Sequence, residues 1–222
     1  MTVDIDKLSR FASTVDKELA YRKRELISHE QLISIADDHQ KTVLFRTGVL
    51  LLYAHWEGFV KSAIKLYLQL YEGHAIGDLP LHAKSALIFQ RLKSDQLDKL
   101  SYKLPKAVFG YLSDSSYCVL HTISNIVDTM SNLDSQRFEY LLHLIENDIS
   151  NLNEYDFFIL NANFIDSELL ATRHKIAHGE RLPVTEDDFK KMSTKTVELI
   201  DKFKESLFDV AHAHYSQLPL GQ

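Results

Sequence analysis

Glycine and proline are scarce in this chain: its 222 residues include seven glycines and four prolines. These two residues interrupt helices and form most tight turns, so their scarcity leaves room for long uninterrupted elements. The apolar residues recur mostly at spacings of three and four rather than in alternation, which is the period of an α-helix. We therefore predict an all-α fold.

Cysteine and long apolar runs are also lacking. The lone Cys118 excludes an internal disulfide and fits a reducing compartment. His121 follows three residues later and would allow a thiol nucleophile, but a small buried thiol on an apolar helix is the favoured interpretation. The apolar run at 49–54 is stopped by His55 and Glu57, far short of the roughly 20 residues that span a bilayer. The N-terminus lacks the order of a signal peptide, so we expect a cytoplasmic protein without a membrane partner.

Positive charge is not in excess, because the chain has 31 acidic and 25 basic residues and a formal net charge of −6. This balance argues against a surface that is basic throughout and binds nucleic acid nonspecifically. A local basic site remains compatible with it. A phosphate-binding glycine loop and a serine elbow are absent from the sequence, so nucleotide hydrolysis and acyl transfer lack support.

The helical pattern divides the chain into segments, with a turn at 73–80 and an N-cap at Thr185 before an acidic first turn. The most apolar segment, 41–72, is expected to be the central helix. We expect one domain over 1–222, with an N-terminal helix in 1–40, a core over 41–212 and a tail at 213–222. The expected helices are 4–35, 41–72, 81–100, 117–130, 136–147, a segment that ends at Gly179, and 186–212.

One stretch combines arginine and histidine at the end of an apolar helix: "LLATRHKIAHGERLP", residues 169–183. Spacing alone selects nothing, because a scrambled chain would contain about one comparable Arg-His pair and this chain contains four. The context of Arg173 and His178 is distinctive, since Gly179 frees the backbone directly after the histidine. On an ideal helix the two side chains point about 140° apart. They converge only if the helix distorts at its end or if a second subunit contributes, so we expect a homodimer.

Three segments of the sequence resemble one family. "RHKIAHGE" is similar to the signature of the HEPN superfamily (higher eukaryotes and prokaryotes nucleotide-binding), in which an arginine and a following polar residue precede a histidine by five to seven positions. "YAHWEGFVKSAIKLYL" at 53–68 resembles the central helix of the RiboL-PSP-type branch, and "SNLDSQRFEYLLHLIE" resembles its middle segment. The resemblance covers about 41 to 210.

The resemblance implies a helical bundle that dimerises and, in active members, a metal-independent endoribonuclease that acts as a toxin or defence effector. By position, Arg173 and His178 would be the catalytic pair and His174 the accessory polar residue. An antitoxin or a defence-system partner is a further implication. Some relatives carry a tyrosine two places after the histidine that a partner enzyme modifies. Glu180 stands there in this chain, so that regulation is not implied.

Arginine and histidine suit RNA cleavage because RNA carries its own nucleophile, the 2′-hydroxyl. The reaction needs a base, an acid and positive charge near the phosphate. Histidine, with an unperturbed pKa of about 6.5, serves as base or acid, and arginine binds phosphate oxygens in a bidentate fork. Lys175 and Arg181 add local positive charge. We expect RNA as substrate and no cofactor, and the sequence does not assign the acid and the base.

Two alternatives concern single residues. Glu57 lies beside Trp56 on an apolar helix, where it either orients Arg173 or a neighbour or sits at a boundary with its carboxylate in water. His174 and His178, four residues apart, share the spacing of a zinc pair. The metalloprotease glutamate is absent between them and no third ligand is evident, so we predict no metal site.

Two alternatives concern the whole protein. The first is a catalytically silent HEPN module, which would be a dimeric adaptor or a nucleotide-binding partner that kept the fold. The second is a plain helical interaction domain. The intact pair of Arg173 and His178 favours the enzyme over both.

Overall fold

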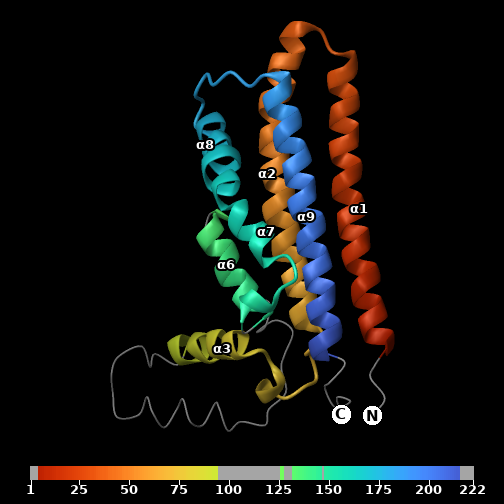
Figure 1. Cartoon of the computed structure of the whole chain (residues 1–222), viewed down its shortest axis with the longest axis vertical. Coiled ribbons are helices and arrows are strands. Elements are labelled where there is room, and N and C mark those ends of the chain that lie inside the picture. The colour runs from red at the N-terminus through yellow and green to blue at the C-terminus, as the bar shows by residue number, and fades with distance from the viewer. Residues whose placement is uncertain (1–4, 95–125, 128–131, 147, 216–222) are drawn as a thin grey trace.

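A computed structural model describes residues 5–94, 126–127, 132–146 and 148–215. Long helices run side by side along the greatest dimension of the molecule (Figure 1); they are α1 (Ile5–Ile35), α2 (Asp38–Gln69) and α9 (Glu186–Tyr215). A short turn reverses the chain between α1 and α2. There the Asp37 side chain accepts from the Gln40 amide and the Gln40 side chain accepts from the Asp37 amide, which is a capping box. Helix α9 runs parallel to α2.

Shorter elements complete the bundle on the side of α2 that faces away from α1 (Figure 1). A π-helical segment, η3, leads directly into α8, and this arm packs along α2. The shorter elements are η1 (Ile76–Asp78), α3 (Leu81–Ser94), α6 (Ser135–His143), η2 (Ile149–Asn151), α7 (Tyr155–Leu160), η3 (Phe164–Leu170) and α8 (Ala171–Ala177). The described residues contain helices and no β-strand, so the all-α prediction is confirmed.

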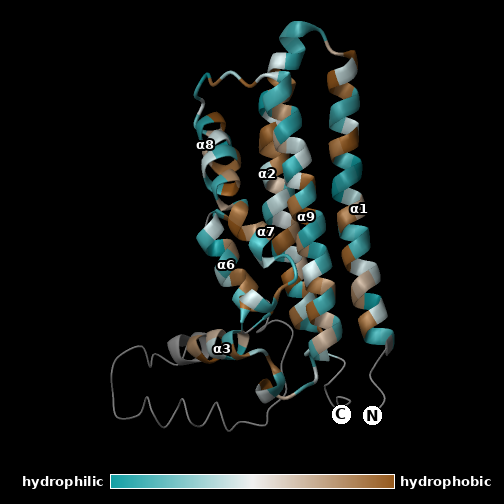
Figure 2. Ribbon diagram, viewed as in Figure 1, coloured by the Kyte–Doolittle hydropathy of each residue, from teal (hydrophilic) through white to brown (hydrophobic). Residues whose placement is uncertain are grey.

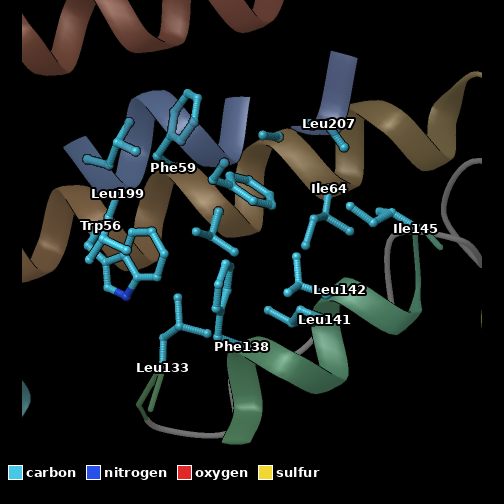
Figure 3. Packing of buried hydrophobic residues seen from close by; sticks show 14 of the residues in the cluster. Trp56, Phe59, Ile64, Leu133, Phe138, Leu141, Leu142, Ile145, Leu199 and Leu207 are labelled. Carbon is cyan, nitrogen blue, oxygen red and sulfur yellow. The ribbon is translucent and has the colours of Figure 1, made fainter. Parts of the chain in front are cut away.

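Helix α2 is the central helix, as its sequence predicted. It packs against α1, α9 and the α8 arm. Its buried residues come mostly as adjacent pairs that recur every three or four positions, which gives the wide apolar stripe that several neighbouring helices cover. Figure 2 shows apolar residues along the long helices where they face one another and polar residues on the outer faces. In Figure 3, Phe138, Leu141 and Leu142 of α6 reach toward Trp56 and Ile64 of α2. Within the described ranges, no helix combines the length and apolar character that crossing a membrane requires.

Several predicted boundaries need correction. The helix expected at 136–147 ends at His143, because the chain turns to bury both Leu144 and Ile145 and the Ile145 carbonyl accepts from the Tyr67 hydroxyl at 3.2 Å. Most of the helix expected at 117–130, with Cys118 and His121, lies outside the described residues, as does the end of the one expected at 81–100. Ile126 and Val127, which are described, are not helical. Helix α7 was not predicted.

Two glycines within α2 provide a matched test of its packing. A Cβ at Gly48 would overlap the ring of Phe189 and lie 2.7 Å from Nε2 of His29, whereas at Gly58 the nearest atom, Nη2 of Arg22, would be 3.5 Å away. Gly48→Ala should therefore destabilise the fold by about 1–3 kcal/mol through overpacking. Gly58→Ala should stabilise it by up to about 1 kcal/mol through helix propensity. Urea denaturation of both variants measures the change in the free energy of unfolding. Equal changes in the two variants would show that α1, α2 and α9 pack less tightly around Gly48 than described.

Candidate active site

The motif with arginine and histidine closes α8 as the sequence predicted. Gly179 adopts a φ of +83°, its N–H donates to the Ile176 carbonyl at 3.0 Å, and the N–H of Glu180 donates to the Lys175 carbonyl at 2.9 Å. These two hydrogen bonds form a Schellman motif, which favours glycine at the left-handed position. The buried side chain of Ile176 anchors this end of the helix to the core. His178 is consequently the first residue beyond the helix.

A π-helical segment, η3, precedes α8 and is the main irregularity of this arm. A π turn widens the helix and changes the direction of the residues that follow. Asp166 of η3 accepts hydrogen bonds from the backbone and the side chain of Ser135, at 2.7 and 2.5 Å, and so ties η3 to the start of α6. The distortion lies before Arg173, whereas 171–177 is regular α-helix. No distortion inside the helix turns Arg173 and His178 toward each other.

Arg173 is half-buried and its guanidinium is oriented by contacts on two sides. Nη1 donates to Oδ1 of Asn132 at 3.1 Å. The guanidinium carbon also lies 4.9 Å from the centroid of the Tyr53 ring, within the range of a cation–π contact. Arg173 is therefore pre-oriented between α2 and the segment before α6.

Tyr53 connects Arg173 to Glu57. The Tyr53 hydroxyl accepts from the Leu133 amide at 2.6 Å and donates to the Glu57 carboxylate. Burial raises the pKa of Tyr53 well above 10, the Glu57 carboxylate raises it further, and Arg173 opposes the shift, so the phenol stays neutral at physiological pH. Glu57 is half-buried and lies one turn after Tyr53 on α2. Glu57 thus contacts the tyrosine on which the Arg173 guanidinium lies.

The histidines lie on the outer side of this cluster. Nε2 of the half-buried His174 is 3.0 Å from Oδ1 of Asn132. The rings of His174 and His178 are 6.2 Å apart between centroids and nearly perpendicular. His178 is exposed, as are Lys175 and Arg181. The described part of the chain has no group of three or more His, Cys, Asp or Glu residues placed to hold a metal ion.

The structure adds residues that the sequence analysis missed. Asn132 and Tyr53 are the direct partners of Arg173, and Arg46 of α2 donates from Nη2 to the Glu180 carbonyl at 2.7 Å, which holds the loop after His178 on the bundle. A signal for Tyr53 was present, because it lies four residues before Glu57 on one face of the same helix. Asn132 had no signal of its own, since only the tertiary fold brings it to α8.

The fold and the site together define a class: a helical bundle in which a motif of arginine and histidine closes a helix beside a tyrosine and a carboxylate of the central helix. The family model described as RiboL-PSP-HEPN matches residues 17–209. The chain therefore belongs to this family of the HEPN superfamily, as the resemblance indicated. The match begins within α1, earlier than the start near residue 41 that the sequence suggested. Neither a curated protein nor a solved structure matches the chain.

Proposed function

We propose that the protein is a metal-independent endoribonuclease, active in the cytoplasm as a toxin or defence effector, that cleaves RNA by attack of the 2′-hydroxyl at a site built on Arg173 and His178. The observation that carries this proposal is the pre-oriented guanidinium of Arg173 on the same helix end as the exposed His178. An oriented cation stabilises the charge that develops on a phosphate at little reorganisation cost. An exposed imidazole at the same helix end is accessible to an RNA backbone.

The chemistry requires two proton transfers and no other reactant. A base takes the proton of the 2′-hydroxyl, the 2′-oxygen bonds to phosphorus, and the bond between phosphorus and the 5′-oxygen breaks as an acid protonates that oxygen. The products are a 2′,3′-cyclic phosphate and a 5′-hydroxyl. His178 suits either role, because an imidazole can give or take a proton near neutral pH. Arg173 neutralises charge on the non-bridging oxygens.

A composite site would bring two copies of the pair to one phosphate. Arg173 contacts Tyr53 of α2 and Asn132, whereas His178 is the exposed C-cap residue of α8, with its ring 6.2 Å from that of His174. A two-fold dimer that brings the two α8 ends together would supply two arginines and two histidines around one phosphate. One His178 then acts as base and the other as acid. Lys175 adds positive charge at the rim, and an antitoxin or defence-system partner would restrain the activity by covering this end.

The test is incubation of the purified protein with structured and unstructured RNA in the presence of EDTA. We expect cleavage that persists with the chelator and that leaves 2′,3′-cyclic phosphate and 5′-hydroxyl ends, which enzymatic end-labelling and mass spectrometry identify. RNA with 2′-deoxy residues should resist cleavage, because the nucleophile is missing. Cleavage that requires a divalent ion and leaves 5′-phosphate ends would contradict the proposal.

One observation favours a second candidate, a catalytically silent dimeric adaptor or nucleotide-binding module. The Arg173 guanidinium already has partners in Asn132 and Tyr53 that fasten α8 to the bundle, so a structural role for this arginine is consistent with its contacts. In that case no RNA would be cleaved, and Arg173→Ala would lower stability without changing any activity. A thermal melt of this variant beside the cleavage assay separates the two candidates.

A further inference from the structure

One side-chain oxygen joins two residues of the motif. Oδ1 of Asn132 lies 3.1 Å from Nη1 of Arg173 and 3.0 Å from Nε2 of His174. Arginine can only donate, so the amide atom that faces it is the oxygen and not the nitrogen. The oxygen can only accept, so a hydrogen bond to it requires a proton on Nε2 of His174. In the neutral imidazole the lone pair is then on Nδ1, which becomes the nitrogen that accepts a proton.

The backbone around Asn132 is fixed by contacts to three elements. The amide of the next residue, Leu133, donates to the Tyr53 hydroxyl of α2 at 2.6 Å. The side chain of Asp134 accepts from the Arg137 amide at 2.7 Å and caps α6. Ser135 donates twice to Asp166 of η3. With three consecutive neighbours held in this way, the carboxamide has little freedom to move relative to α8.

We propose that Asn132 is a positioning residue of the site, which holds Arg173 and His174 on one oxygen and sets His174 in the tautomer whose Nδ1 accepts a proton. His174 is then an accessory acceptor whose ring lies 6.2 Å, between centroids, from that of His178, the residue that carries out the proton transfers proposed above. The importance of this arrangement for catalysis rests on the ribonuclease proposed above. The tautomer itself does not, because it follows from the hydrogen bonds alone.

The chemistry of the side chain explains why an amide suits this place. A carboxylate would also accept from both donors, but its charge would neutralise Arg173 and raise the pKa of His174 by stabilising the imidazolium. The neutral amide orients both groups and leaves the positive charge of Arg173 available to a phosphate. A residue without an acceptor would orient neither of them.

The first test reads the tautomer of His174 by ¹⁵N NMR of the full chain labelled at histidine, with His174→Gln used to assign its signals. We expect Nε2 protonated and Nδ1 unprotonated in the neutral ring. Asn132→Leu should release this preference, and Asn132→Asp should keep it and shift the titration midpoint of His174 to higher pH. His29, whose Nε2 lies 3.0 Å from the Leu44 carbonyl, is the control and should be unaffected. A proton on Nδ1 of wild-type His174, or no change in Asn132→Leu, would overturn the proposal.

The second test measures RNA cleavage by the same variants. Asn132→Leu should lower kcat by about 10²-fold with a smaller change in KM, because misplacement of a catalytic group by about 1 Å has an effect of this size. Asn132→Asp is isosteric with the wild type and therefore serves as a control for a folding defect. It should retain more activity than Asn132→Leu and move the acidic limb of the pH–rate profile to higher pH. A structural role would leave that limb unmoved, and full kcat in a folded Asn132→Leu would contradict the positioning role. If the wild type cleaves no RNA, the proposed function fails, and the tautomer still decides whether Asn132 positions His174.

Discussion

His178→Ala is expected to lower the rate of RNA cleavage by about 10²–10⁴-fold, the range that general acid–base catalysis contributes, while the fold remains intact. His178 lies just outside α8 and its side chain is exposed. The helix end depends on backbone hydrogen bonds and on Gly179, not on the imidazole. Single-turnover cleavage at pH 7, together with circular dichroism and a thermal melt, measures both effects.

A matched control for this variant is His212→Ala. His212 is also an exposed histidine of the chain, but it lies near the end of α9, far along the bundle from α8. The His212→Ala variant should cleave RNA at the wild-type rate. If His178→Ala cleaves as fast as His212→Ala, the site is wrongly assigned even if the protein is a ribonuclease.

The same variant also tests whether the site is composite. Differently tagged wild-type and His178→Ala chains are co-expressed at varied ratios. If the site needs both copies of His178, only dimers of two wild-type chains are active, and the activity is proportional to the square of the wild-type fraction. If the site is complete within one chain, the activity is proportional to the wild-type fraction itself. A linear dependence would therefore exclude the composite mechanism and leave the assignment of His178 standing.

The long helices were predictable because their stability depends on a local pattern. In 41–72 a stripe of apolar residues advances by three or four positions, and the residues of this stripe, such as Val49, Leu52 and Trp56, are buried in the core. The end of α8 was predictable for the same reason, since Gly179 supplies the left-handed conformation that a Schellman motif uses. These features require no knowledge of which helix packs against which.

Features that depend on tertiary contacts were not predictable. The widened turn of η3 has no signature in "FIDSELL"; its Asp166 is bonded to Ser135, more than 30 residues earlier in the chain. The chain leaves α6 at His143 because Leu144 and Ile145 fill the core, although the apolar pattern continues. In the sequence, nothing distinguishes Asn132 from an ordinary polar residue before a helix. Its meaning depends on the contact with Arg173, which only the assembled bundle creates.

Trp56→Ala is expected to destabilise the fold by about 3–5 kcal/mol, as removal of a fully buried tryptophan usually does. The side chain is completely buried, and its ring packs edge-on against Phe138 of α6 with centroids 4.9 Å apart (Figure 3). The cavity would open between α2 and α6, where the surrounding helices restrict collapse. Urea denaturation followed by circular dichroism measures the loss.

Trp56→Phe is the informative control, because the indole N–H is buried without a hydrogen-bond partner among the described residues. Burial of an unsatisfied donor costs about 1–3 kcal/mol, so its removal offsets part of the lost volume. The phenylalanine variant should therefore lose less than half of the unfolding free energy that the alanine variant loses, and equal losses would mean that the donor is satisfied.

The contact between Trp56 and Phe138 also affects the site, since Phe138 belongs to the helix that Asn132 precedes. Trp56→Ala should accordingly slow RNA cleavage at temperatures where it is still folded, whereas Trp56→Phe should not.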